Sequence, residues 1–270
     1  MSIITISRGS YSNGKEVAEK VAEKLNYECI SRDILLAASK EFNIPEIRLV
    51  RALHDAPSVL DRFSYGKERY VAYIRYAFLN YVQKDNIVYH GLAGQYFIQD
   101  VPHALKVRII ANLEDRVQEE MKREDISEDE ARYQLKKDDE ERRKWSMSLY
   151  GIDTWDPNLY DLVIHIDTLG VEEAVDLICR TAEYQCFQTT EDSKHILQQK
   201  LLAAHIKADL AADYPTAKVN IEEGNAYINV QGRISNQEKI QEGIRNKLKG
   251  YAELKKVEVF VNPVVEYGAY

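Results

Sequence analysis

This sequence has few cysteines and no long apolar run. Its 270 residues include three cysteines, Cys29, Cys179 and Cys186, whose spacing matches neither a metal site nor an even disulfide framework. No segment approaches the roughly 18 uninterrupted apolar residues of a membrane-spanning helix, and the first residues lack the charged-then-apolar pattern of an export signal. We therefore expect a protein of the reducing cytoplasm without a transmembrane segment.

Positive charge is in the minority, with 36 lysines and arginines against 44 aspartates and glutamates and a net charge of −8. This balance argues against a general nucleic-acid-binding protein, although local basic clusters keep their effect inside an acidic chain. With 45% hydrophobic and 30% charged residues, the composition is that of an ordinary globular protein. The length leaves room for one large domain, or for a large and a small one.

Residues 1–18 are typical of a strand, a phosphate-binding turn and the start of a helix. Residues 3–6 form an apolar, β-branched run, which suits a strand buried on both faces. Apolar residues recur at helical spacing at Val17, Val21 and Leu25. Between these segments lies a G-x-x-x-x-G-K pattern, in which backbone N–H groups surround phosphate oxygens and the lysine reaches the outer phosphates. It comprises Gly9, Ser10, Tyr11, Ser12, Asn13, Gly14 and Lys15.

Glu16 departs from the usual phosphate-binding loop, which carries a Ser or Thr here whose hydroxyl binds Mg²⁺. Alternatively, the two glycines serve an ordinary strand-to-helix turn, with Glu16 and Glu19 as first-turn acids that complement the helix dipole. Because the strand, both glycines, the lysine and the helix occur in order, we favour phosphate binding. The unpaired N–H groups and the dipole of a helix N-terminus both attract an anion.

Arg32 follows a second expected strand, residues 27–30, and precedes a helix that begins near Asp33. Ligands of an open parallel sheet collect beyond the carboxyl ends of its strands, so Arg32 is a candidate for holding a second anionic group. The alternative is a surface arginine that pairs with Asp33 or Glu28.

A third buried strand is expected at residues 86–90, followed by a glycine-containing turn, residues 91–94. Glycine lets the backbone approach a ligand closely, which makes Gly91 a candidate for substrate binding. His90 ends the strand and is a candidate for a catalytic contact or a contact to Mg²⁺-bound water; the alternative is a structural histidine. The aromatic residues that recur at helical spacing in residues 65–82 predict a core helix rather than a platform for bases.

Residues 114–144 contain few apolar residues and many charges of both signs. One interpretation is a solvated helical hairpin with ion pairs four residues apart, whose second arm begins at a capping box of Ser127 and Glu130. The other is a mobile lid whose arginines close over a triphosphate, stabilise the transferring phosphoryl group and exclude water. The position of the segment after a phosphate-binding loop favours the lid.

The C-terminal third predicts a second, smaller unit. A strand at residues 160–166 and a helix at 171–184 are followed by a polar stretch, 185–193, which suits a linker. We therefore expect two domains, residues 1–185 and an α+β module of residues 193–263. The elements expected in the module, in the order α-β-β-α-β, are residues 196–210, 218–222, 226–231, 236–248 and 256–261, with a tight turn at Gly224 and Asn225.

These features resemble the cytidylate kinase-like proteins of the P-loop nucleoside-monophosphate kinase group. The resemblance runs in order through residues 1–185: the N-terminal loop, Ser31-Arg32-Asp33, the strand before residues 91–94, Leu113-Glu114-Asp115-Arg116, the charged lid and the strand at 160–164. It implies an α/β fold, a three-layer P-loop kinase core with a central parallel sheet and a helical lid. It also implies phosphoryl transfer from ATP, with Mg²⁺, to a nucleoside monophosphate, with CMP or dCMP favoured.

The resemblance also implies roles for residues at matched positions. Members of this branch commonly carry Arg-Glu or Lys-Glu where other P-loops carry Lys-Ser or Lys-Thr, as Lys15 and Glu16 do here. An arginine often found beside the glycines of the third strand is absent, and Leu92 stands nearby. Residues 9–15 would cradle the donor phosphates, Arg32 would contact the acceptor phosphate, Arg116 would lie near the donor nucleotide, and Arg123, Arg142 and Arg143 would be the catalytic cations of the lid.

Residues 193–263 resemble the bacterial BON domain, including Gly232 after the second strand. BON domains are associated with ligand or membrane-surface interaction, so the resemblance implies regulation, or assembly into a homo-oligomer. Two functional hypotheses follow. The first is an ATP-dependent nucleoside monophosphate kinase, and the second is a nucleotide-binding sensor in which a degenerate kinase core controls the C-terminal module.

Overall fold

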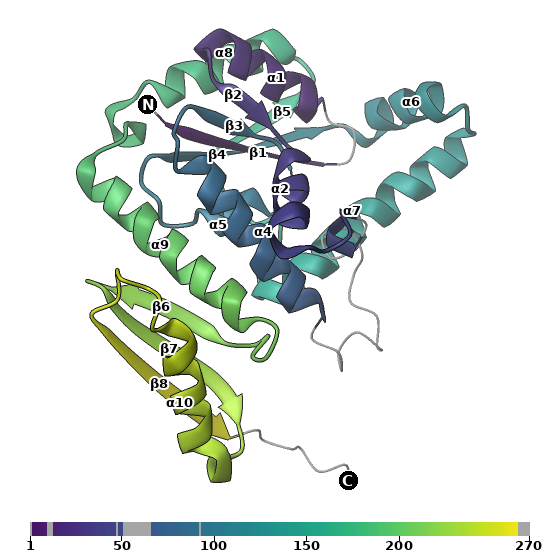
Figure 1. Cartoon of the computed structure of the whole chain (residues 1–270). Helices are drawn as coiled ribbons and strands as arrows, with labels where there is room; N and C mark the ends of the chain where they lie inside the picture. The colour runs from purple at the N-terminus through teal and green to yellow at the C-terminus, as the bar shows by residue number, and fades with distance from the viewer. Residues whose placement is uncertain (1, 10–12, 47, 51–65, 92, 264–270) are drawn as a thin grey trace.

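A five-stranded parallel sheet forms the centre of the first domain. The computed structural model describes residues 2–9, 13–46, 48–50, 66–91 and 93–263 (Figure 1). The strand order is β2-β3-β1-β4-β5, and Ile3 lies in register between Ile87 and Ala104. The strands are β1 (Ile3–Arg8), β2 (Glu28–Ile30), β3 (Ile87–Tyr89), β4 (Ala104–Ala111) and β5 (Leu162–Ile166).

Helices cover both faces of this sheet. Ile4 and Ile6 of β1 pack in one apolar cluster with α1 (Gly14–Leu25) and α8 (Val171–Ala182), while Ile3 belongs to the opposite cluster. The second cluster includes residues of α2 (Asp33–Phe42), α4 (Gly66–Val82) and α5 (Gly94–Phe97). Successive strand residues point to opposite faces, and apolar residues on both faces explain the continuous hydrophobic runs. The expected α/β, three-layer architecture is confirmed.

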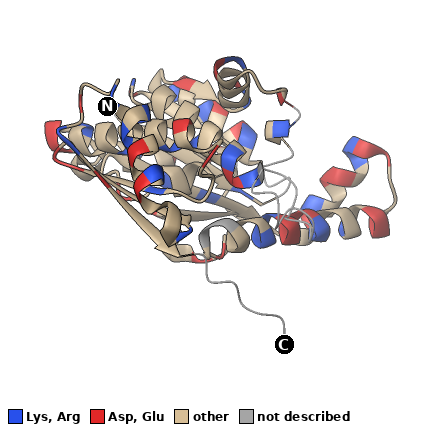
Figure 2. Ribbon diagram, turned by 60° about the horizontal axis from the view of Figure 1, so that its bottom comes forward, with Lys and Arg blue, Asp and Glu red and all other residues tan. Residues whose placement is uncertain are grey.

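The charged segment forms a helical hairpin that extends from the core (Figure 1). Its arms are α6 (Leu113–Glu124) and α7 (Glu128–Tyr150), and acidic and basic residues alternate along them (Figure 2). The Ser127 hydroxyl accepts a hydrogen bond from the backbone N–H of Glu130 and so caps α7, which is the Ser127 half of the predicted capping box. A small buried cluster, Val117, Ala131 and Leu135, joins the arms, and the 3-10 helix η2 (Pro157–Leu159) leads from the hairpin to β5.

The C-terminal module contains a three-stranded mixed sheet in the order β6-β7-β8. Strand β7 pairs antiparallel with β6 and parallel with β8. The module has the expected α-β-β-α-β order, with η4 (Ile234–Asn236) between β7 and the second helix. Its helices and strands are α9 (Glu191–Leu210), β6 (Lys218–Glu222), β7 (Asn225–Gly232), α10 (Gln237–Leu248) and β8 (Lys256–Pro263).

The linker expected at residues 185–193 is shorter than predicted. It contains η3 (Gln185–Phe187), and α9 begins at Glu191, before the predicted start at residue 196. Thr190 and Ser193 form a capping box, in which each side chain bonds the backbone of the other residue. This local capping overrides the polar composition that favoured a linker.

Helix α9 belongs to two apolar cores. Leu197, Ala204 and Ala208 pack in the cluster that contains α4, whereas Ile206 and Leu210 pack with the module sheet and α10. The helix therefore runs along the first domain on one face and covers β6 on the other (Figure 1). The expected division into two domains, residues 1–185 and 193–263, stays a prediction.

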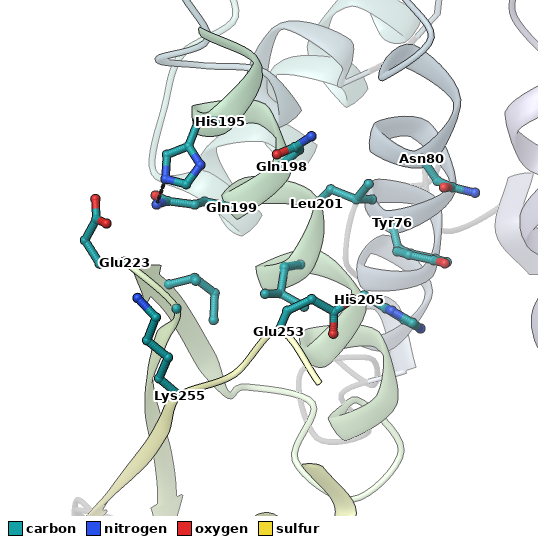
Figure 3. A pocket seen from close by; sticks show the side chains of 13 residues that line it. Tyr76, Asn80, His195, Gln198, Gln199, Leu201, His205, Glu223, Glu253 and Lys255 are labelled. Atoms are coloured by element: carbon teal, nitrogen blue, oxygen red, sulfur yellow. Dashed lines mark hydrogen bonds between the residues drawn. The ribbon is translucent and has the colours of Figure 1, made fainter. Parts of the chain in front are cut away.

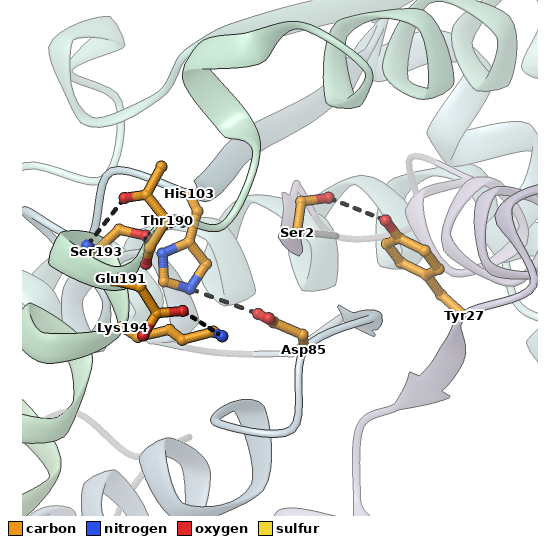
Figure 4. Close-up of polar contacts among 8 residues, drawn as sticks. All are labelled: Ser2, Tyr27, Asp85, His103, Thr190, Glu191, Ser193 and Lys194. Atoms are coloured by element: carbon orange, nitrogen blue, oxygen red, sulfur yellow. Dashed lines mark hydrogen bonds and ion pairs between the residues drawn. The ribbon is translucent and has the colours of Figure 1, made fainter.

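The amino end of the sheet lies beside the start of α9 (Figure 4). His103 is fully buried before β4, its Nε2 lies 3.5 Å from Oδ1 of Asp85, and its backbone carbonyl accepts a hydrogen bond from the Ile3 N–H. Burial lowers the pKa of the His103 imidazole, although the Asp85 carboxylate opposes the shift. None of the described helices is long and apolar enough to cross a membrane.

Candidate active site

The end of β1 and the first turn of α1 flank the expected phosphate-binding turn at the carboxyl edge of the sheet. Gly9 donates its N–H to the Ile109 carbonyl (3.2 Å), and Asn13 precedes α1 with a left-handed φ of 58°. A Cβ on Gly14 would lie 2.8 Å from the Cβ of Arg8, so only glycine fits against the end of β1. The predicted loop residues Ser10, Tyr11 and Ser12 lie outside the described residues.

Lys15 and Glu16 are exposed in the first turn of α1. Lys15 lies 3.6 Å from Glu19, with 63% of its side chain exposed, so a weak surface pair is all that an incoming phosphate has to displace. Glu16 pairs with Lys20 at 2.9 Å. The Glu16 and Glu172 carboxylates raise the pKa of Lys20 to about 12, with the hydrogen bond to Glu172 the larger cause.

The end of β3 places His90 and Gly91 beside this turn. His90 is 8% exposed, and its Nδ1 has no hydrogen-bond partner among the described residues. Burial and the nearby Arg8 charge lower the pKa of His90, so the imidazole is neutral at pH 7. A Cβ on Gly91 would lie 2.4 Å from the Tyr89 hydroxyl, so this glycine is required by packing against Tyr89.

Arginines from four elements gather around Gly9. A cavity of about 250 Å³ is lined by Gly9, Arg108 of β4, Arg116 of α6, Asp139 of α7 and Trp155, among others. A narrower cavity of about 30 Å³ next to it also contains Gly9 and adds Arg8 of β1 and Arg142 of α7. This concentration of positive charge suits a ligand with several phosphates.

Two of these arginines are held in place by buried partners. Arg116 donates to Asp139 at 2.7 Å, and both side chains are largely buried, which ties the first turn of α6 to the middle of α7. Arg108 donates to the Tyr160 hydroxyl at 3.2 Å and lies 5.5 Å from the centre of the Tyr160 ring. The Tyr160 hydroxyl donates in turn to the Thr154 carbonyl at 3.0 Å. Both arginines are thus fixed before a ligand arrives.

Comparison with known proteins identifies the family of this chain. The profile of the family described as "Cytidylate kinase-like family" matches residues 3–168, more than half of the chain. The chain belongs to the cytidylate kinase-like family. Membership, together with the sheet order, confirms the expected P-loop kinase fold and supports nucleotide or small-molecule kinase activity.

Curated relatives and a solved structure cover the same part of the chain. A cytidylate kinase of Archaeoglobus fulgidus is 30% identical over 185 residues, which is 67% of this chain and 94% of the relative. A cytidylate kinase of Sulfolobus acidocaldarius is 25% identical over 65% of this chain and 91% of its own length. A crystal structure of an uncharacterized protein from Eubacterium ventriosum superposes with a TM-score of 0.52 at 21% identity, over 68% of this chain and all of that chain.

The two other arginines expected to act in the lid of this cytidylate kinase-like chain are differently placed. Arg143 pairs with Asp153 at 2.6 Å and lies over the Trp155 ring, 5.0 Å from its centre. The pKa of Asp153 is lowered, first by the Trp155 backbone N–H and then by Arg143. Arg123 pairs with Glu120 and Glu124, both at 2.9 Å, and lines neither of the two cavities beside Gly9. The structure therefore brings Arg142 and Arg116 to the candidate site around Gly9, sets Arg143 beside it through Trp155, and leaves Arg123 in pairs within α6.

Arg32 sits at the start of α2, with 75% of its side chain exposed, and makes a two-pronged pair with Glu46 at 2.5 and 3.0 Å. The expected surface partners were different. Asp33 accepts from the Ser31 backbone N–H, and Glu28 accepts from the Tyr81 hydroxyl. The Glu46 carboxylate raises the pKa of Arg32, and the Arg32 guanidinium in turn lowers the pKa of Glu46. An acceptor phosphate would have to replace the Glu46 carboxylate, which presents the same geometry to the guanidinium.

The sequence interpretation missed several residues of this kinase-like site: Arg8, Gln95, Arg108, Asp139, Trp155 and Tyr160. A signal existed for Arg108. Lys106 and Arg108 lie on the same face of a strand whose other residues are mostly buried and apolar. A charged residue inside a parallel sheet needs a partner or a ligand. Trp155 carried no comparable signal, because it follows α7 in a segment without periodicity.

The family match ends at residue 168, before the C-terminal module. The likeness of residues 193–263 to BON domains, and their part in forming a homo-oligomer or binding a ligand, stay predictions.

Proposed function

We propose that this protein is an ATP-dependent nucleoside monophosphate kinase, with CMP or dCMP as acceptor. The observation that carries the proposal is the group of four arginines around Gly9, at the edge of the sheet between the end of β1 and the start of α1. They are Arg8, Arg108, Arg116 and Arg142. Two cytidylate kinases that match this chain along more than nine-tenths of their own lengths support the choice of acceptor.

The donor triphosphate would lie at the turn before α1. Backbone N–H groups at the helix N-terminus would hold its phosphates, and Lys15 would place a charge on the transferring group. The close approach of Gly14 to Arg8 and the arginines beside Gly9 fit such an anion. Mg²⁺ would neutralise part of the phosphate charge. Because Mg²⁺ in phosphoryl-transfer sites is bound largely through substrate phosphates, we expect the ion to be held chiefly by ATP oxygens.

The acceptor phosphate would be oriented by Arg108 and Arg142, and Arg32 would add a contact after releasing Glu46. An acceptor phosphate oxygen attacks the γ-phosphorus of ATP, the bond from that phosphorus to the bridging oxygen breaks, and ADP leaves with the electron pair. The attacking oxygen already carries negative charge at pH 7, so the reaction needs positioning and charge neutralisation rather than a general base. His90, neutral and beside the turn, would orient water or phosphate without taking a proton.

ADP release with a panel of nucleoside monophosphates tests this function. We expect turnover with CMP and dCMP to exceed that with AMP, GMP and UMP. Arg108→Met should raise the KM for CMP about ten-fold or more, since it removes a charge-assisted contact to phosphate. Arg245→Met, which removes an exposed arginine from α10, is the matched control and should leave KM unchanged.

Two results would contradict the proposal. Absence of turnover with every monophosphate, combined with ATP binding in calorimetry, would favour the nucleotide sensor. Absence of ATP binding would exclude both the kinase and the sensor.

A further inference from the structure

A second cavity of the described residues lies far along the chain from the expected phosphate-binding loop. It has a volume of about 490 Å³ and is enclosed by α4, α9, the β6–β7 turn and the segment before β8 (Figure 3). This volume is in the range of small-molecule sites. Gly9, Lys15 and the lid arginines are not among its lining residues, so it is a different site from the proposed kinase centre.

One wall of this cavity is aromatic. His205 of α9 stacks on Tyr76 of α4, with ring centres 4.5 Å apart and planes 19° apart, and both residues line the cavity. Tyr251 is not a lining residue, but its ring contacts that of His205 edge-on at 5.1 Å. Leu201, Leu202 and Ile221 add apolar surface. A flat aromatic wall beside aliphatic side chains favours a planar, largely apolar ring system.

Carboxamides supply the hydrogen-bonding groups that suit a heterocycle. Asn80, Gln198 and Gln199 line the cavity, and each offers both a donor and an acceptor. Gln199 is itself positioned by a 2.8 Å hydrogen bond to His195 on the preceding turn of α9 (Figure 3). Paired donors and acceptors on Asn and Gln are the groups that read the edge of a nucleobase.

The charges around the cavity exclude a phosphate-rich ligand. Glu223 and Glu253 contribute two carboxylates against one ammonium group, that of Lys255. The hairpin turn is fixed to the opposite segment because the Lys255 backbone N–H donates to the Gly224 carbonyl at 2.8 Å, so the carboxylates sit on a preformed rim. Carboxylates accept hydrogen bonds from sugar hydroxyls but repel phosphate.

We propose that this cavity is a second, regulatory site that binds an unphosphorylated nucleoside, with the base against His205 and the sugar hydroxyls at Glu223 and Glu253. Because its walls come from α4 of the kinase-like core and from the β6–β7 hairpin, the bound nucleoside contacts both parts of the chain. A nucleoside that binds the folded chain but not the unfolded chain raises thermal stability. The bound nucleoside also holds the C-terminal module more firmly to the core.

Calorimetric titration of the full chain with cytidine, uridine, adenosine and guanosine tests the site. We expect at least one nucleoside to bind with 1:1 stoichiometry at a Kd below about 1 mM, and to raise Tm. Glu253→Ala should weaken that binding about ten-fold, because it removes an acceptor for a sugar hydroxyl. Glu242→Ala, which removes an exposed carboxylate from α10 outside the cavity, should leave binding unchanged. Leu202→Trp, which fills the cavity, should abolish it.

A competition experiment separates this site from the proposed kinase centre. Saturating CMP together with ADP should not displace the nucleoside, whether or not the protein turns over CMP. The inference is overturned if none of the four nucleosides binds, if Glu253→Ala leaves binding unchanged, or if CMP and ADP displace the nucleoside.

Discussion

Lys15 is the residue whose replacement should affect catalysis most at least cost to the fold. Lys15→Ala should lower kcat/KM by about 100-fold, because a charge aimed at the transferring phosphate is worth about 3 kcal/mol in the transition state. Its side chain is 63% exposed and pairs only weakly with Glu19, so Tm should change little. Steady-state kinetics and a thermal scan of the same preparation measure the two effects.

The matched control for this lysine is Lys24→Ala, in the last turn of the same helix, where Lys24 pairs with Asp176 of α8. It removes an exposed ammonium group that lies away from the loop, and turnover should remain near the wild-type value. Unchanged turnover in Lys15→Ala, or loss of its fold, would refute the assignment of Lys15.

Lys207 makes stability depend on pH. Burial in α9 lowers its pKa to about 8, and its ammonium donates to the Pro215 carbonyl at 2.5 Å. Since the unfolded chain has the ordinary, higher lysine pKa, it binds more protons than the folded chain between about pH 8 and 10.5. The free energy of unfolding should therefore rise with pH in this window, by about 1 kcal/mol per unit near pH 9, through this group.

Lys207→Met isolates that contribution. Urea unfolding at pH 8.5 and 9.5 should show a smaller gain in stability for the variant than for the wild type, because other titrating groups are common to both. Equal gains would mean that Lys207 titrates normally.

At the scale of elements, the Arg116–Asp139 pair should hold the two arms of the charged hairpin together. Asp139→Ala leaves the buried Arg116 guanidinium without this carboxylate, and removing one member of a buried pair costs about 3 kcal/mol. The control is Glu140→Ala, which breaks the exposed pair with Lys144 on the same helix and should cost less than about 0.5 kcal/mol. Urea unfolding followed by Trp fluorescence compares them, and similar losses would argue against a structural role for the pair.

The elements near the phosphate-binding loop could be predicted because their signals are local. The strand at residues 3–8, both glycines and the helix after Lys15 follow one another within 25 residues, and alternation or helical spacing identifies each. The capping box of Thr190 and Ser193 is also a local signal for the start of α9, but the polar composition of residues 185–193 favoured a linker instead.

Contacts between distant elements could not be predicted in this way. Arg32 had two plausible partners nearby, and the structure pairs it with Glu46, fourteen residues away. Arg108 and Tyr160 meet because β4 and β5 are adjacent in the sheet, a relation that one sequence does not reveal. The apolar residues of α9 were visible on the helix, but the division of its two faces between two cores depends on how the domains pack.

For the whole molecule, the sharing of α9 predicts that the kinase-like core and the module unfold together. Ile244→Ala truncates a buried side chain in the module core. It should lower the free energy of unfolding by about 2–5 kcal/mol, the usual range for a buried isoleucine. Calorimetry should show a single transition, shifted as a whole. A second transition that keeps its wild-type midpoint would show that the module folds on its own.

The place of α9 in the chain also sets the order of events during synthesis. The side of α4 that α9 covers is made early, and about 130 residues separate the end of α4 from the end of α9, which corresponds to roughly 6 to 26 s of translation at 5–20 residues per second. Throughout that interval the ribosome-bound chain carries an apolar helix face that its own sequence has not yet covered. Nascent chains stalled before residue 190 should therefore bind chaperones that recognise exposed apolar surface, and chains stalled after α9 has left the ribosome should release them.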